Sequence, residues 1–466
     1  VELGECLLFD AGTAQAAVDT VRAYAATHPE LKWIRGTGWQ YPLFPNANPS
    51  KALLDQAVPD RPVLMYSYDG HSAWVNSQAL ALAGITRDTP DPPTGRIERN
   101  PRTREPTGTL REAAMDLVTK FLPDYTDAER SAGLARVEER ANAFGITTVF
   151  AANAGEAELR SYHETDRAGN LTFRVVAALS VGEDTSDALL PRLREWRTRF
   201  ASPHVHPIAV KLFADGVMES RTAALLQPYL HHPGDAGTPN YDQPTLDRLT
   251  AEFDRGGFQI HVHAIGDRAI RMALDAFEKA RAQNGARDSR HSIAHLQLID
   301  PADIPRFREL GVVANFEALW ANGDEYLTKL ADPMLGPRRA RWEYPIASVV
   351  RTGAVVSGGS DWSVSSLNPL DAIEMGITHL DPERPGMAVW NPAERVDLPT
   401  MIALYTINAA YANRLERETG SIEVGKLADL VILDRNLFDV PVNQIHTVKV
   451  VRTLLEGNTV YRAPGE

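Results

Sequence analysis

Four polar residues, each within or just after an apolar stretch, are the first candidates for chemistry in this sequence. They are Lys211 in VKLFADG, His263 in IHVHAIGD, His295 in HSIAHLQ and Asp361 in VSGGSD. Two imidazoles and a carboxylate suit Zn²⁺ or a similar divalent ion. A lysine in an apolar strand is costly to bury as a cation, so we expect Lys211 to be neutralised or modified. Carboxylation by carbon dioxide would make it an anionic ligand with two oxygens.

Each of these residues also has an ordinary structural interpretation. A histidine in a strand is more often a hydrogen-bonded core residue than a ligand, Lys211 alone could be a salt-bridged lysine, and Asp361 alone could cap a helix. We expect His261 and His291 to be structural, because the first lies deeper in its strand and the second begins one. Four such residues at strand ends are far less expected by accident, and the joint pattern favours a site.

The stretch 256–270, GGFQIHVHAIGDRAI, indicates how one candidate is positioned. Apolar and polar residues alternate from 258 to 263, which is typical of a strand, and apolar residues recur at helical spacing from 270 onward. The predicted strand therefore ends at His263 and leads through a turn into a helix. In α/β barrels, active-site residues lie at this end of the strands.

The same order of strand, loop and helix recurs along the chain. It predicts either a (β/α)₈ barrel that lacks one strand or an open doubly wound sheet. No Gly-x-Gly-x-x-Gly fingerprint follows the first of these strands, which counts against a dinucleotide-binding sheet. In a barrel, the four candidates would meet at one rim. The predicted strands are 146–152, 173–181, 207–213, 258–263, 291–298, 311–316 and 354–361.

The rest of the chain predicts additions to this barrel. Residues 14–28 have the pattern of an amphipathic helix. Residues 35–123 are rich in Pro, Gly and Asn, and we interpret them as an irregular insertion in a barrel spanning 1–400. Within it, 61–80 predicts a strand, a turn and a helix from about Ser72. Residues 401–466 predict a final helix and part of a small β-sandwich.

Composition excludes several classes of function. The net charge of −13 disfavours a surface for nucleic acid or anionic membranes. The only cysteine is Cys6, so neither an intrachain disulfide nor a thiolate metal cluster can form. No apolar run reaches the length of a membrane span, and no signal segment is visible. We expect a cytoplasmic homodimer that acts on a small molecule, and a chain that starts at Val1 because residues upstream are not included.

Eight stretches of the sequence together resemble the amidohydrolase superfamily, and most closely its YtcJ-like branch, amidohydrolase family 3, which includes N-substituted formamide deformylase. They extend over nearly the whole chain, although GKLAD by itself is shared across the superfamily. The stretches are GTGW (36–39), DGHSAWVNSQAL (69–80), GITTV (145–149), VKLFADG with SRTAAL (210–225), HAIGDRAI (263–270), IAHLQLI (293–299), GGSDW (358–362) and GSIEVGKLADLVILD (420–434).

The resemblance implies a role for each candidate. Lys211 would be a carboxylated ligand on the fourth barrel strand, and His263 and His295 would be ligands on the fifth and sixth. Asp361 on the eighth strand would bind metal and shuttle protons. The insertion, residues 35–123, would lie between the first and second barrel strands and cover the site. The site would hold one or two divalent ions, zinc being the first expectation.

Four further residues are candidates for binding the substrate. Asp215 and Arg221 follow the Lys211 strand, in either a substrate-facing loop or a plain turn with a helix cap. His71 lies in the predicted insertion, as part of either a lid or a surface turn. Trp39 belongs to the GTGW stretch.

The sequence departs from the family in one respect. The first barrel strand of the family ends in a His-x-His pair that binds metal, and this sequence shows no such strand. We therefore expect the chain to begin just after it.

The activity implied is hydrolysis of a carbon–nitrogen bond in an amide-like substrate by a metal-activated water. A catalytically silent binding protein and an ester or lactone hydrolase are the alternatives.

Overall fold

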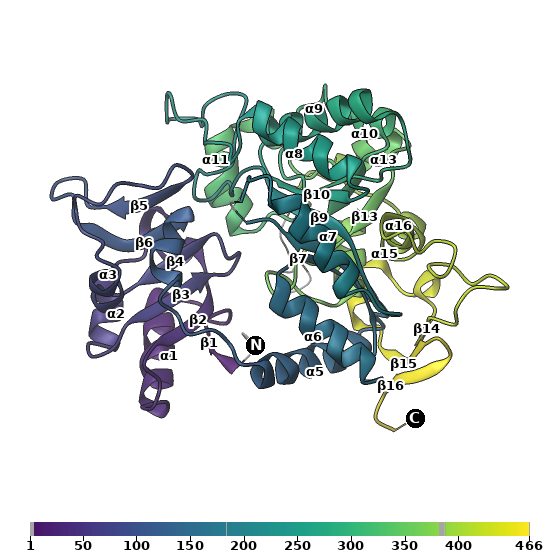
Figure 1. Cartoon of the computed structure of the whole chain (residues 1–466), viewed down its shortest axis with the longest axis horizontal. Coiled ribbons are helices and arrows are strands. Elements are labelled where there is room, and N and C mark those ends of the chain that lie inside the picture. The colour runs from purple at the N-terminus through teal and green to yellow at the C-terminus, as the bar shows by residue number, and fades with distance from the viewer. Residues whose placement is uncertain (1–3, 183, 382–385, 387, 466) are drawn as a thin grey trace.

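A computed structural model describes residues 4–182, 184–381, 386 and 388–465 of the chain. Its strands form three sheets, each built from one part of the sequence. In Figure 1, the N-terminal sheet (purple and blue) lies at the left, a parallel sheet lies in the centre, and a small C-terminal sheet (yellow) lies at the lower right.

The N-terminal sheet has six strands in the order β1-β2-β3-β4-β6-β5. Strands β1, β2 and β3 run parallel, and the remaining pairs are antiparallel. Helix α1 (Ala14–Thr27) confirms the predicted amphipathic helix and buries Val18 and Val21. The strands are β1 (Cys6–Leu7), β2 (Ile34–Trp39), β3 (Val63–Ser67), β4 (Ser72–Val75), β5 (Gly95–Arg99) and β6 (Pro106–Glu112), and the other helices are α2 (Lys51–Ala57), α3 (Ser77–Leu82) and α4 (Asp116–Thr119).

Residues 35–123 are thus more regular than expected, since they supply most of a sheet that also includes β1. The prediction of a helix from Ser72 is wrong. Residues 72–75 form β4, all four of them buried, and α3 begins only after Asn76, whose side-chain oxygen accepts a hydrogen bond from the Ala79 amide at 3.0 Å. Burial between two strands has overridden the local helical pattern here.

The central sheet confirms the seven predicted parallel strands. They pair in sequence order, β7 to β13, and within the described residues β7 and β13 are its two edges. This is the curled, open sheet expected of a barrel without its first strand. The strands are β7 (Thr148–Ala154), β8 (Arg174–Ser180), β9 (Val205–Phe213), β10 (Gln259–Ala264), β11 (Ser292–His295), β12 (Val313–Phe316) and β13 (Val356–Gly358).

Helices that follow the strands cover the outer face of this sheet (Figure 1). Ile260 and Val262 of β10 belong to the same buried apolar cluster as Leu249 of α8 and Ile270 of α9. Alternation along the strand then places His261 and His263 on the opposite face. The helices are α5 (Asp127–Ala143), α6 (Glu156–Arg167), α7 (Leu189–Arg199), α8 (Gln243–Arg255), α9 (Asp267–Asn284), α10 (Ile304–Leu310), α11 (Asp332–Leu335), α12 (Pro337–Ala340), α13 (Ile346–Arg351) and α14 (Pro369–Thr378).

The C-terminal part differs from the prediction in one detail. The single helix expected at 401–416 is two helices, α15 (Leu398–Tyr405) and α16 (Ile407–Ala412), because the backbone at Thr406 leaves helical geometry. The expected strands form one antiparallel sheet of β14 (Leu430–Leu433), β15 (Val450–Leu455) and β16 (Asn458–Arg462). Buried Arg174 of β8 ties this sheet to the barrel by pairing with Asp429 and Glu456.

Across the described ranges, none of the helices combines the length and the apolar character needed to cross a bilayer.

Candidate metal and active site

The parallel sheet brings Lys211, His263, His295 and Asp361 to one end. Lys211 and the two histidines lie in the C-terminal halves of β9, β10 and β11, and Asp361 follows β13 by three residues. The ring centroids of His263 and His295 lie 4.6 Å apart. Lys211 and Asp361 interact electrostatically with each other and with His295. The structure therefore assembles the four residues that the sequence singled out.

His295 is held by two neighbours that sequence reasoning missed. Its Nδ1 hydrogen-bonds to Glu317 Oε2 at 3.0 Å, and its ring stacks on Trp320 with centroids 5.4 Å apart. This bond occupies Nδ1 and leaves Nε2 as the second ring nitrogen. Burial lowers the pKa of His295 to about 3, so the ring is neutral and able to act as a ligand.

His263 is anchored through Nε2, whereas His295 is anchored through Nδ1. Its Nε2 donates to the Gly216 carbonyl at 3.0 Å, which leaves Nδ1 as the second nitrogen. Burial holds the pKa of His263 well below its usual range. The neighbouring His261 bonds Ser292 Oγ at 2.8 Å, which fits the structural role expected of it. The two candidate ligands are thus both buried, neutral and fixed through one nitrogen each.

Lys211 and Asp361 supply the charged part of the site. Lys211 is 4% exposed and its ammonium lies 4.7 Å from the centroid of the Phe213 ring. Burial lowers its pKa to about 8, although Asp361 and Glu317 oppose this shift. Asp361 is exposed to solvent on one side, yet desolvation by the surrounding protein raises its pKa. Lys211 therefore loses its proton more easily than a free lysine. Asp361, with which it interacts electrostatically, holds its proton more strongly than a free aspartate.

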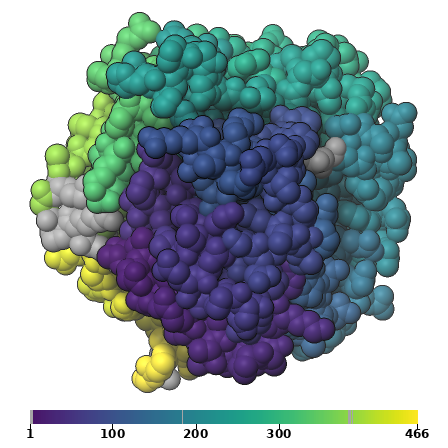
Figure 2. All heavy atoms as spheres, turned by 90° about the vertical axis from the view of Figure 1, so that its left-hand side faces the viewer, coloured from purple at the N-terminus to yellow at the C-terminus, as the bar shows by residue number. Residues whose placement is uncertain are grey.

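His71 reaches this group from the N-terminal sheet. It lies in the turn between β3 and β4, and its ring centroid is 4.9 Å from that of His263. Its Nδ1 pairs with Glu112 Oε2 at 2.9 Å. Burial disfavours the charged ring, but the Glu112 carboxylate outweighs burial and raises the pKa of His71 to about 9. Figure 2, which views the molecule from the side of the N-terminal sheet, shows the atoms of that sheet covering the middle of this face.

Of the other three predicted substrate-binding residues, Asp215 lies beside the cluster, with its Oδ1 3.6 Å from His263 Nε2, whereas Arg221 and Trp39 make other contacts. Asp215 is fully buried and uses its oxygens to accept backbone N–H groups of Ala224, Ile265 and Gly266 at 2.8–3.0 Å, so it organises the loops around β10. Arg221 pairs with Asp235 at 3.3 Å. Trp39 is fully buried in the core of the N-terminal sheet, where it donates to the Met65 carbonyl.

Glu112 is a further site residue that sequence reasoning missed, in addition to Glu317 and Trp320. Glu317 follows the predicted strand 311–316 directly, so the rule that selected His263 and Asp361 could have found it. Glu112 ends an antiparallel strand of the other sheet, and nothing in its sequence context pointed to the site.

The donor set fits a divalent ion only in part. Within the described ranges, no group of three or more His, Cys, Asp or Glu side chains is arranged to hold a metal ion. The ring nitrogens left over by the hydrogen bonds are Nδ1 of His263 and Nε2 of His295, and an unmodified lysine amine does not complete a zinc site with them. Carboxylated Lys211 would supply the third, anionic ligand.

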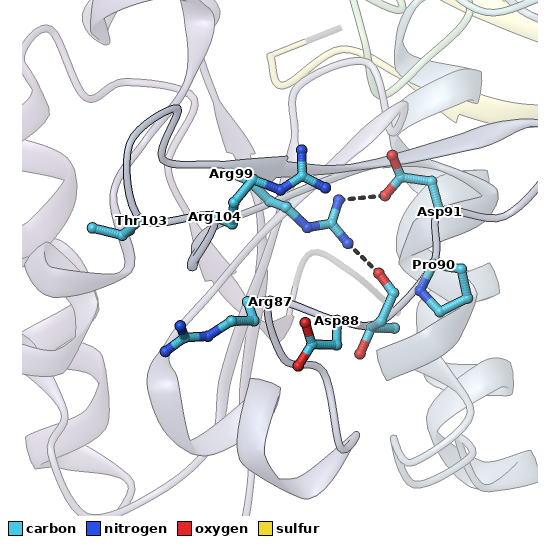
Figure 3. A pocket seen from close by; sticks show the side chains of 8 residues that line it. Arg87, Asp88, Pro90, Asp91, Arg99, Thr103 and Arg104 are labelled. Carbon is cyan, nitrogen blue, oxygen red and sulfur yellow. Dashed lines mark hydrogen bonds and ion pairs between the residues drawn. The ribbon is translucent and has the colours of Figure 1, made fainter.

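A polar cavity elsewhere in the N-terminal sheet is separate from this cluster. It has a volume of about 440 Å³, and Arg99 within it bonds Asp91 and the Thr89 carbonyl (Figure 3). None of the candidate site residues lines it. The lining residues are Arg87, Asp88, Thr89, Pro90, Asp91, Arg99, Thr103 and Arg104.

Comparison with known proteins decides the family. The pattern of the amidohydrolase family, Amidohydro_3, matches residues 1–461. This chain belongs to the amidohydrolase family. It is 32% identical to Protein LONG AFTER FAR-RED 3 of Arabidopsis thaliana, over 93% of this chain and 74% of that one.

Two further relatives place the chain in the YtcJ-like branch. The putative amidohydrolase YtcJ of Bacillus subtilis is 29% identical over 93% of this chain and 80% of its own length. N-substituted formamide deformylase of Arthrobacter pascens is 26% identical over 99% of this chain and 85% of its own.

A solved structure supports the fold. An uncharacterized metal-dependent hydrolase from Pyrococcus furiosus superposes with a TM-score of 0.66 at 25% identity, over 91% of this chain and 81% of that one. The predicted barrel-type α/β fold of an amidohydrolase is confirmed.

Proposed function

We propose that this amidohydrolase hydrolyses a carbon–nitrogen bond in an amide-like substrate, with a divalent metal ion, in the first instance zinc, as its cofactor. The observation that carries the proposal is the pair His263 and His295, each neutral and each anchored through one ring nitrogen. The name of the formamide deformylase relative supports the type of bond. Cytoplasmic location and a homodimer remain predictions from the sequence.

The metal would be held by Nδ1 of His263, Nε2 of His295 and a carboxylated Lys211. When bound, such an ion lowers the pKa of a coordinated water and polarises the substrate carbonyl. The lowered pKa of Lys211 supports the modification, because only a neutral amine reacts with carbon dioxide.

Asp361 is the group that moves the proton in this proposal. It takes the proton from the attacking water and delivers it to the leaving nitrogen. Its access to solvent and its raised pKa support a role as base and then acid. His71, whose ring centroid lies 4.9 Å from that of His263, would contact the substrate.

A second candidate is a binding protein without turnover. Two observations favour it: the incomplete donor set within the described residues, and the similarity to a relative whose name describes a light response rather than an enzyme. It predicts protein that is folded and binds ligand but has no hydrolytic rate above background.

Elemental analysis and a substrate panel separate these candidates. We expect the purified full-length protein to carry at least about one zinc per chain and to cleave at least one of N-benzylformamide, N-acetyl amino acids and simple anilides. Cleavage of lactones or esters alone would replace the amide proposal with the ester alternative. Protein that carries no metal and shows no turnover would support the silent binding protein.

A further inference from the structure

Glu112 connects the N-terminal sheet to the barrel at the candidate site. Its Oε2 pairs with His71 Nδ1 at 2.9 Å, and its Oε1 accepts a hydrogen bond from Thr222 Oγ1 of the barrel at 2.7 Å. The side chains of His71 and Glu112 are only 15% and 11% exposed. Both carboxylate oxygens are therefore used, one to hold a ring and one to hold a loop.

Two features of the backbone, one at Glu112 and one at Gly216, allow the contacts of the Glu112 carboxylate. Glu112 has φ of +48°, a conformation that costs energy for a residue with a side chain and that is found mostly where function requires it. A Cβ at Gly216 would lie 2.2 Å from Glu112 Oε1 and 2.1 Å from Thr222 Oγ1. Gly216 must therefore lack a side chain for the contact between Glu112 and Thr222 to exist.

The same glycine also fixes a candidate ligand. Its carbonyl accepts the hydrogen bond from His263 Nε2 at 3.0 Å. One loop thus places both the carboxylate that holds His71 and the carbonyl that holds His263, whose ring lies next to that of His71. The same loop therefore fixes the positions of His71 and His263 relative to each other.

The bond to Glu112 has a chemical consequence for His71. A carboxylate at Nδ1 fixes the orientation of the ring, as the aspartate of a catalytic triad does for its histidine. The remaining nitrogen, Nε2, is then the one left for a substrate. A hydrogen-bond donor fixed beside a hydrolytic centre stabilises the negative charge that develops on a carbonyl oxygen.

We propose that His71 donates this hydrogen bond from Nε2 to the substrate's carbonyl oxygen, and that Glu112 is the positioning residue that orients His71 for it. The proposal rests on the hydrolytic function proposed above and identifies the N-terminal sheet as part of the reacting site. The substrate class it selects is one with a carbonyl oxygen next to the scissile nitrogen.

The test is a double-mutant cycle on the zinc-loaded full-length enzyme, with the best amide of the panel as substrate. We expect His71→Asn to lower kcat by about 100-fold, and Glu112→Gln by about 10-fold, with KM and zinc content within about threefold of wild type. The double variant should be no slower than His71→Asn alone, because Glu112 acts only through His71. Glu98→Gln, which removes a carboxylate of the same sheet that pairs with Arg96 and Arg111 instead, is the matched control and should keep kcat.

The outcomes are distinct. Independent losses that multiply in the double variant, or losses confined to KM or to zinc content, would overturn the positioning role. ¹⁵N-histidine NMR provides a readout without substrate: the His71 signal should show Nδ1 protonated in wild type and should change in Glu112→Gln. An unchanged signal would also overturn the proposal, whereas a wild type that cleaves no substrate in the panel would overturn the hydrolase function itself.

Discussion

Glu317 Oε2 is hydrogen-bonded to His295 Nδ1 at 3.0 Å, so Nε2 is the ring nitrogen left to face a metal ion. The carboxylate is itself fixed, because Asn315 donates to its Oε1 at 2.8 Å and Ser357 in turn donates to Asn315 at 3.2 Å. A chain of hydrogen bonds thus runs across β13, β12 and β11 to one ring. Partners of this kind keep a ligand in the geometry that the metal requires.

Removing this partner should weaken metal binding. We expect Glu317→Leu to lower the affinity for Zn²⁺ by about 10–100-fold, the range found when the partner of a metal-bound histidine is lost. Competition with a chromogenic chelator measures the affinity without any substrate. Glu317→Gln, which keeps an acceptor for Nδ1–H, is the control and should retain most of it. Equal affinities in wild type and Glu317→Leu would show that His295 does not bind the ion through Nε2.

Asp361 should be needed for turnover more than for metal. We expect Asp361→Asn to lower kcat by at least about 10²–10⁴-fold, since the amide cannot accept a proton from water. Zinc content should stay close to that of wild type, because the three proposed ligands are unchanged. Rates and elemental analysis on the same preparation check both expectations. Turnover that persists in Asp361→Asn would remove the proton-transfer role.

Carboxylation of Lys211 should make reconstitution depend on carbon dioxide. We expect protein stripped of metal by a chelator to regain zinc and activity faster with bicarbonate than in buffer purged of carbon dioxide. ¹³C NMR after labelling with ¹³C-bicarbonate should show one carbamate signal in wild type and none in Lys211→Ala. Reconstitution that is indifferent to bicarbonate, without a carbamate signal, would argue that the lysine is unmodified.

Much of the site could be predicted because its residues lie on one repeated element. Lys211, His263, His295 and Asp361 each stand at the same end of a parallel strand, and adjacent parallel strands bring such positions together whatever the loops do. The seven strands were recognisable for the same reason, since each is a short apolar run between turn signals.

The parts that could not be predicted depend on contacts between distant elements. His71 directly precedes β4 and Glu112 ends β6, the antiparallel neighbour of β4, so the two residues are 41 positions apart, and Glu112 meets Thr222 across 110 positions. Ser72 enters a strand instead of a helix because both neighbouring strands bury it. The pairing of Arg221 with Asp235 could not be predicted either, because Asp235 lies in a long loop with no periodic signal.

The far end of the barrel allows a test of the fold that is independent of function. Asp254 lies in the last turn of α8, where the helix dipole disfavours a negative charge, and it is 2% exposed. Burial would raise its pKa, but hydrogen bonds from His291 at 3.2 Å, Asn284 at 2.7 Å and Arg287 outweigh burial and hold the pKa well below its usual value of 3.8. His291 thus has the structural role that its place at the start of a strand predicted.

Replacing Asp254 should therefore cost stability in a pH-dependent way. Since its pKa is lower in the folded state than in the unfolded chain, the charged group stabilises the fold above about pH 4, and the contribution is lost as the pH falls below that value. We expect Asp254→Asn to be less stable than wild type by about 2–4 kcal/mol at pH 7, with a gap that narrows toward pH 3. Urea unfolding followed by circular dichroism at several pH values measures the gap. Asp19→Asn, whose side chain is 54% exposed on α1, is the control and should change stability by less than about 0.5 kcal/mol. A gap that stays constant with pH would mean that Asp254 acts by packing rather than by charge.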